Sequence, residues 1–332
     1  MVGIPEMSSK VHKLILGESL TALTTETFSN EDLIVDLWEG GSVLYGWDLG
    51  NACIDRLPMV SKYKCSFTHK EVHTEFFEFK PSIQLIGTEK GFEDKIDLAN
   101  VQVNWLKTIV KGGYVPLNGW CTLFRMLKSV VKVRRIYGEI KYILPSKNLI
   151  KISWIEGLIY EELINTMPIP YILDKIIWDE HKYERLKSKS RFEYTSLYVI
   201  TLLTKLIKGT DEVKAILVGK KGLLSALIIM IPSNIIYKRL GSYLLVYVLA
   251  PLTMKNLRAE LNTKILSEIK KLNVITNLND IYFYRDYFEK YAFLGNINDE
   301  GKEVIHTLLD IYGIKLKGRL GTWKEKYLCC KF

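Results

Sequence analysis

Residues 155–170, IEGLIYEELINTMPIP, lie where the pattern of the chain changes. Pro168 and Pro170 remove backbone donors and force the residues before them out of helical conformation. Short runs of β-branched and aromatic residues recur between turn signals before this stretch, whereas helical spacing of apolar residues dominates after it. The sequence therefore predicts an α+β fold with a β-rich N-terminal half and an α-helical C-terminal half.

Several strands are expected in the N-terminal half. Residues 33–38 and 42–47 flank a Gly-Gly turn and are predicted to form a hairpin. A further strand is expected at 82–88. Residues 134–144 and 149–154 flank the Pro-Ser-Lys-Asn turn at 145–148, which is typical of a second hairpin.

Two segments in the C-terminal half have the spacing of amphipathic helices. In residues 254–274, apolar side chains recur at steps of three and four, with charged residues between them. Residues 299–312 form the second, with Asp299 as the expected N-cap and Gly313 as the residue that ends the helix.

These patterns divide the chain into four predicted segments. They are an N-terminal arm (1–30), a β-rich domain (31–155), a helical domain (171–313) and a basic tail (314–332). The tail is expected to be a dispensable interaction segment, because its charge density cannot be buried without partners. Its last four residues, Cys-Cys-Lys-Phe, resemble a lipidation signal imperfectly, since a lysine stands where an aliphatic residue belongs.

Composition indicates a folded protein with a basic surface. The chain has 332 residues, 48% hydrophobic and 25% charged, and a net charge of +9. Such a charge favours a polyanionic partner. The five cysteines are irregularly spaced, and no signal peptide is visible, so an intracellular, cytoplasmic location is expected. The apolar runs 222–232 and 243–254 are each too short to cross a membrane, and are expected to be buried core elements.

Motifs for catalysis or for cofactor binding are not found. Gly40, Gly41, Gly46 and Gly50 match no dinucleotide fingerprint and are interpreted as turn residues. Residues 218–222 (VGKKG) lack the spacing of a phosphate-binding loop, and no Gly-x-Ser-x-Gly elbow is present. No cofactor and no catalytic residue are therefore predicted.

A metal site is also not expected. His69, Glu71 and His73 are the nearest approach to one, but the surrounding residues alternate as in a strand. The two imidazoles would then lie about 13 Å apart, at about 3.3 Å per residue, which is too far to share an ion.

Basic residues cluster with aromatic residues in one segment. Cations beside aromatic rings suit a single-stranded nucleic acid, through phosphate contacts and base stacking. A charged, solvated helix face is the structural alternative. The candidate binding residues are Lys182, Tyr183, Arg185, Lys187, Lys189 and Arg191, with Arg134 and Arg135 from the N-terminal half.

Three functions are compatible with these observations. The first is a non-catalytic nucleic-acid-binding protein, such as a viral accessory protein that packages or transports RNA (movement-type). The second is a peripheral membrane or scaffold protein that uses the basic tail on an anionic surface. The third is an enzyme whose residues come from distant positions and leave no local motif. Of these three functions, the sequence favours the first, a non-catalytic nucleic-acid-binding protein.

Overall fold

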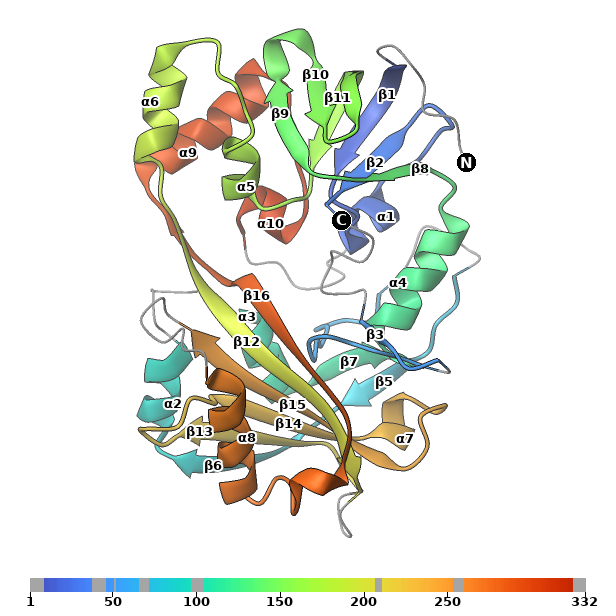
Figure 1. Cartoon of the computed structure of the whole chain (residues 1–332), viewed down its shortest axis with the longest axis vertical. Helices are drawn as coiled ribbons and strands as arrows, with labels where there is room; N and C mark the ends of the chain where they lie inside the picture. The colour runs from blue at the N-terminus through green and yellow to red at the C-terminus, as the bar shows by residue number, and fades with distance from the viewer. Residues whose placement is uncertain are drawn as a thin grey trace.

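The computed structural model describes residues 9–37, 46–50, 52–65, 72–96, 104–206, 211–252 and 260–324. They form two lobes, each built on one large β-sheet, and the long strands β12 and β16 run between the lobes (Figure 1). We call the sheet that contains β1 the upper sheet and the sheet that contains β12 the lower sheet.

The upper sheet has the strand order β8-β2-β1-β11-β10-β9, and β17 also pairs with β11. Strand β1 is parallel to both β2 and β11, and β2 is parallel to β8. The strands are β1 (Ser9–Leu16), β2 (Leu33–Asp36), β8 (Arg134–Tyr137), β9 (Ile140–Leu144), β10 (Leu149–Ile152), β11 (Ile155–Asn165) and β17 (Lys315–Leu316).

The lower sheet has the order β16-β12-β15-β14-β13-β6 and is antiparallel except where β13 meets β6. Its strands are β6 (Ser82–Gly87), β12 (Phe192–Lys205), β13 (Lys214–Gly219), β14 (Leu227–Pro232), β15 (Tyr243–Leu252) and β16 (Ile281–Ile297). Two small ribbons lie between the lobes: β3 (Trp47–Asp48) with β4 (Cys53–Ile54), and β5 (Phe76–Phe79) with β7 (Gly113–Pro116).

Helices are distributed along the whole chain. The upper lobe carries α1 (Leu20–Thr25), α5 (Ile169–Leu173), α6 (His181–Lys189), α9 (Asp299–His306) and α10 (Gly318–Thr322). The lower lobe carries α2 (Glu89–Ile96), α3 (Asn104–Lys111), α7 (Ser233–Ile236) and α8 (Leu261–Lys271). Helix α4 (Gly119–Val130) leads from the region between the lobes to β8 (Figure 1).

The predicted division into a β-rich and an α-helical half is wrong. The structure is a sheet-rich, mixed α/β fold in which helices are interspersed among the strands of the described residues. The longest strands, β12 and β16, lie in the half expected to be helical. Strands β14 and β15 are buried along nearly their whole length, so they lack the alternation by which a half-exposed strand is identified.

Other local predictions agree with the structure. The strand at 82–88 is β6, and the hairpin around Pro145 is β9 and β10. Both apolar runs contribute core strands, β14 and β15, which pair with each other. Helix α8 lies within the predicted 254–274 segment, and α9 begins where a helix was expected, although Asn298 is the N-cap and not Asp299.

The predicted hairpin of residues 33–38 and 42–47 does not describe β2. This strand pairs in parallel with β1 and β8, and residues 42–45 lie outside the described part of the chain. Among the described residues, no helix is both long enough and apolar enough to span a membrane.

Candidate functional site

Most of the predicted binding residues lie on α6. Lys182 pairs with Glu180 at 2.8 Å and stacks over Tyr183, and Lys187 pairs with Asp174 at 2.9 Å. The Tyr183 ring packs against Trp178 and Tyr312. Arg185, like Lys182, is exposed, so α6 has the character of a solvated helix face with its aromatic residue packed inward.

The other two predicted residues lie far from α6. Arg134 and Arg135 belong to β8, at the right of the upper lobe in Figure 1, whereas α6 is at the left. Arg134 is exposed, but Arg135 points into the protein and is held by carbonyl groups at the end of α4. The eight residues therefore do not form one surface.

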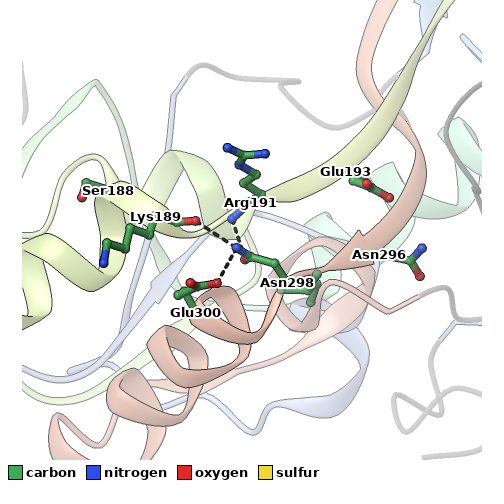
Figure 2. A pocket seen from close by; sticks show the side chains of 8 residues that line it. Ser188, Lys189, Arg191, Glu193, Asn296, Asn298 and Glu300 are labelled. Atoms are coloured by element: carbon green, nitrogen blue, oxygen red, sulfur yellow. Dashed lines mark hydrogen bonds between the residues drawn. The ribbon is translucent and has the colours of Figure 1, made fainter.

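Lys189 and Arg191 line an open polar pocket of about 540 Å³. Figure 2 shows the Asn298 side chain at its centre. The Asn298 Oδ1 atom accepts from the backbone amides of Arg191 and Gly301, and its Nδ2 atom donates to the Lys189 carbonyl and to Glu300. Both polar side-chain atoms of Asn298 are thus hydrogen-bonded to other parts of the chain. We therefore interpret the pocket as a structural connection between the end of α6, the start of β12 and α9.

A different group of polar residues meets at the carboxyl ends of β1, β2 and β8. Gly17 follows β1 directly and has a φ of +95°, a left-handed conformation that favours glycine. A Cβ atom at this position would lie 2.6 Å from Thr166 Oγ1, so the turn from β1 into α1 requires glycine on steric grounds also. Ser19 caps α1 by accepting from the Ala22 amide at 3.1 Å.

Glu18, between these two residues, has a buried carboxylate. Its side chain is 3% exposed and accepts from Arg135 Nε and from the Tyr137 hydroxyl, the latter at 3.2 Å. Lys128 Nζ of α4 lies 3.4 Å from the same carboxylate and donates to Tyr137 at 2.7 Å. The Glu18 carboxylate thus contacts two cations. Because all three groups are largely buried, solvent screens the attraction between them only weakly.

Asp36, at the end of β2, is bonded to the same turn. Its carboxylate accepts from the amides of Glu18 and Leu37 at 2.8 and 2.7 Å. Burial raises the pKa of Asp36, the two backbone hydrogen bonds oppose this rise, and the Glu18 charge adds to it. Two acidic side chains thus lie together at this edge. We call Glu18, Asp36, Lys128, Arg135 and Tyr137 the carboxyl-edge cluster.

Of these five residues, only Arg135 is among the binding residues predicted from the sequence. The available signal was the apolar strand ending at Leu16, followed by Gly17, with Asp36 about 20 residues further on. The dinucleotide fingerprint has three glycines in the pattern G-x-G-x-x-G, and Ser19 and Ala22 occupy its second and third positions. The chain therefore has only the first glycine of the fingerprint, and residues 17–22 do not match the motif.

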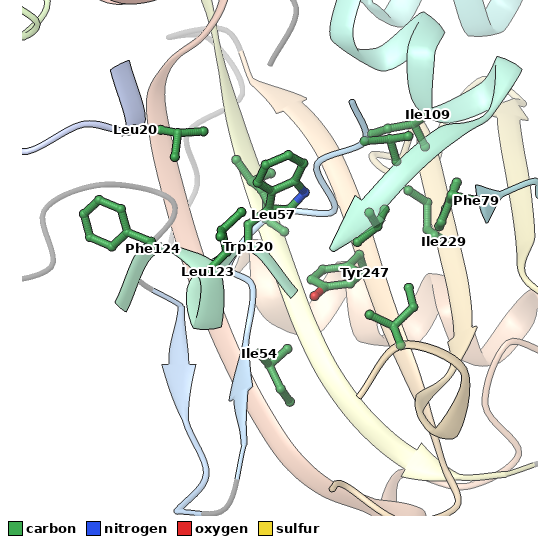
Figure 3. Packing of buried hydrophobic residues seen from close by; sticks show 14 of the residues in the cluster. Leu20, Ile54, Leu57, Phe79, Ile109, Trp120, Leu123, Phe124, Ile229 and Tyr247 are labelled. Atoms are coloured by element: carbon green, nitrogen blue, oxygen red, sulfur yellow. The ribbon is translucent and has the colours of Figure 1, made fainter. Parts of the chain in front are cut away.

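A second buried polar group contacts Trp120 and Tyr247, two of the buried residues that Figure 3 shows. The Asp55 carboxylate accepts from the Trp120 and Cys121 amides at 3.0 and 2.7 Å, at the start of α4, and from the Tyr237 hydroxyl at 3.1 Å. Tyr247 donates to the Asp55 carbonyl. Burial raises the pKa of Asp55 to about 6. Because Asp55 is enclosed, we assign it to capping of α4.

Cys53 and Cys121 form a disulfide that joins β4 to α4, with Cα atoms 5.9 Å apart. Irregular cysteine spacing had indicated no disulfide framework; the two residues are 68 positions apart and meet only through the fold. Within the described ranges, no cluster of His, Cys, Asp and Glu could hold a metal ion. The predicted strand face with His69 and Glu71 lies outside those ranges, and His73 precedes β5.

No protein-family model and no curated protein matches the chain. Solved structures do match the chain. Reduced UDP-galactopyranose mutase aligns with a TM-score of 0.75 and 12% identity over 95% of this chain and 89% of its own. Putrescine oxidase bound to putrescine aligns with a TM-score of 0.59 and 8% identity over 92% and 91% of the two chains. An oxidoreductase from Methanosarcina mazei aligns with a TM-score of 0.55 and 10% identity over 85% and 89%.

At these identities the similarity shows the fold. It corrects the interpretation of the chain as a non-catalytic RNA-binding, movement-type viral protein, because the solved structures that share the fold over most of the chain are a mutase, oxidases and an oxidoreductase. The basic residues behind that interpretation do not form one surface, as described above. Binding to single-stranded nucleic acid or to an anionic membrane stays an untested prediction.

Proposed function

We propose that the protein is an enzyme, an oxidoreductase or a mutase, that binds a flavin dinucleotide at the carboxyl-edge cluster. One observation carries this proposal: Gly17 forms a left-handed turn after β1, and Asp36 ends the neighbouring parallel strand β2. In Rossmann-type folds, the first βα turn approaches the pyrophosphate, and an acidic residue at the end of the second strand binds the ribose. The reaction classes are those of the structural neighbours.

The residues fit the adenosine half of a dinucleotide. Each carboxylate oxygen can accept two hydrogen bonds, and each Asp36 oxygen receives one from a backbone amide. Asp36 therefore keeps capacity to accept from ribose hydroxyls. Gly17 supplies the tight turn after β1, which is the role of the first glycine of the fingerprint.

The fit is poorer at the pyrophosphate. Ser19 stands where the fingerprint has its second glycine, and Glu18 adds a negative charge beside the turn. Two cations, Lys128 and Arg135, contact the Glu18 carboxylate. They can bind an anionic ligand only after the Glu18 side chain has moved away from them. A flavin, when bound, supplies hydride-transfer and electron-transfer chemistry, and the chain supplies binding and orientation.

The test is a titration of the purified protein with flavin adenine dinucleotide, followed by quenching of flavin fluorescence. We expect saturable binding that weakens about tenfold in Asp36→Asn, because an amide replaces one acceptor oxygen with a donor. Asp310→Asn is the matched control, since Asp310 is an exposed carboxylate in the π-helical segment Thr307–Ile311 that follows α9, where it pairs with His306. The affinity of Asp310→Asn for flavin adenine dinucleotide should equal that of the wild type.

Two results would count against the proposal. A folded wild-type protein that binds no flavin at about 100 μM, a concentration at which a weak site with a binding free energy of about 5.5 kcal/mol is half occupied, would exclude the cofactor. Equal affinities of Asp36→Asn and the wild type would move the ligand away from the end of β2.

A further inference from the structure

We propose that Glu18 is a built-in competitor of the ligand at the carboxyl-edge cluster: its carboxylate occupies the cations that the pyrophosphate of a dinucleotide would use. This inference rests on the proposed function and concerns how access to the same site is controlled. The ligand class is a nucleotide with a diphosphate group, and displacement of Glu18 is the step that admits it.

Glu18 is the second residue of the β1–α1 turn, and its backbone amide donates to Asp36 at the end of β2. Its side chain extends toward β8, whose strand partner is β2. Glu18 therefore lies along the carboxyl edge of three parallel strands, where Rossmann-type folds place the dinucleotide.

A pyrophosphate is recognised by backbone amides, by cations and by hydroxyl groups. At this edge each of these kinds of donor bonds to an oxygen of the chain itself. The Glu18 amide bonds to Asp36, the Ala22 amide to Ser19, and Arg135 and the Tyr137 hydroxyl to the Glu18 carboxylate.

A buried carboxylate and a diphosphate repel each other strongly, because the surroundings of Glu18 exclude the water that would screen them. The two cations that could offset this repulsion, Lys128 and Arg135, contact the Glu18 carboxylate in the structure. The anionic ligand must therefore displace the Glu18 side chain before Lys128 and Arg135 can face it.

Arg135 keeps its other contacts when the Glu18 side chain moves. The Arg135 guanidinium also donates to the carbonyl groups of Val133, Lys128 and Val131, at 3.0 to 3.2 Å. These carbonyls keep Arg135 in place at the end of α4 when Glu18 moves. Substitution of Glu18 by an uncharged residue should for the same reason leave the fold intact.

The experiment measures the dissociation constant of flavin adenine dinucleotide for the wild type and for Glu18→Gln, by fluorescence quenching, with thermal unfolding as the check on folding. Glutamine has the same shape and keeps an acceptor for Arg135 but removes the charge. We expect Glu18→Gln to bind at least tenfold more tightly. Glu18→Ser, which also removes the carboxylate, is a second variant should the first fail to fold.

Glu161→Gln is the matched control. The Glu161 carboxylate also contacts two basic groups, Lys10 at 2.7 Å and His12 at 2.8 Å, but it is about half exposed and lies on β11. Glu161→Gln should bind the dinucleotide with the same affinity as the wild type. Glu18→Asp keeps the charge on a shorter side chain and should show no comparable gain.

The outcomes separate the two proposals. Wild-type binding with no gain in Glu18→Gln or Glu18→Ser overturns the role of Glu18 and leaves the proposed function standing. Binding by the variants alone supports the role of Glu18 but shows that the natural chain does not use the dinucleotide. No binding by any folded variant overturns both.

Discussion

Asp55 is the buried ionisable residue whose environment has the clearest consequence for stability. Its three hydrogen bonds and the start of α4 favour the charged form, but burial outweighs them and raises the pKa to about 6. The folded protein therefore binds a proton at Asp55 more tightly than the unfolded chain, in which the pKa is about 3.9.

We predict that the contribution of Asp55 to stability falls as the pH rises from about 4 to about 6, and stays low above that range. The expected loss is about 2–3 kcal/mol, at 1.36 kcal/mol per pKa unit. Asp55→Asn cannot titrate. The free energy of unfolding, measured by denaturant titration at pH 4, 5, 6 and 7, should therefore fall less steeply with pH in Asp55→Asn than in the wild type. Parallel curves would refute the prediction.

At the scale of elements, the segment after Gly313 differs most from its sequence-based description. Ile314 is fully buried, β17 pairs with β11, and Trp323 is 3% exposed. The Trp323 ring packs edge-on against Phe192 at 5.3 Å and Tyr291 at 5.6 Å. Residues 314–323 thus belong to the upper lobe, although they had been expected to form a dispensable tail; residues 325–332 lie outside the described ranges.

We predict that Trp323→Ala lowers the free energy of unfolding by about 3–5 kcal/mol, because it empties a buried aromatic site. Lys324→Ala, at the exposed neighbouring position, should change it by less than about 0.5 kcal/mol. Guanidinium denaturation of both variants provides the measurement. Equal, small effects would restore the description of the segment as a tail.

For the whole molecule, the main question is whether the two lobes are independent. One hydrophobic cluster contains Ile15 and Ile34 of the upper sheet together with Leu197 and Tyr247 of the lower sheet. Phe124 of α4 belongs to the same cluster, and the two longest strands run between the lobes (Figure 1). A continuous core of this kind couples the stability of its parts.

We therefore predict that the lobes unfold together. In native-state hydrogen exchange, the slowest amides of β1 and β15 should report the same free energy of opening. Phe124→Ala should lower both values by a similar amount, about 3–5 kcal/mol, whereas Ile311→Ala, whose side chain is 57% exposed, should lower neither. A loss confined to β1 would show that the lobes are separate units.

The sequence by itself determined the local elements and the ends of several of them. Apolar spacing located α8, the Pro145 turn located the β9–β10 hairpin, and Gly313, with a φ of +62°, ends the helical segment before it as expected. These features depend on residues within a few positions of each other. Their period and turn chemistry are therefore present in the sequence.

Only the tertiary structure decided which strands are neighbours and which side chains meet. Ser9 pairs with Leu158, and the Glu18 carboxylate meets Arg135 more than one hundred positions away. Parallel pairing joins distant segments without a local turn, and strands buried on both faces lose the alternation that would identify them. The carboxyl-edge cluster is therefore assembled by packing between distant segments, of which the sequence shows only single residues.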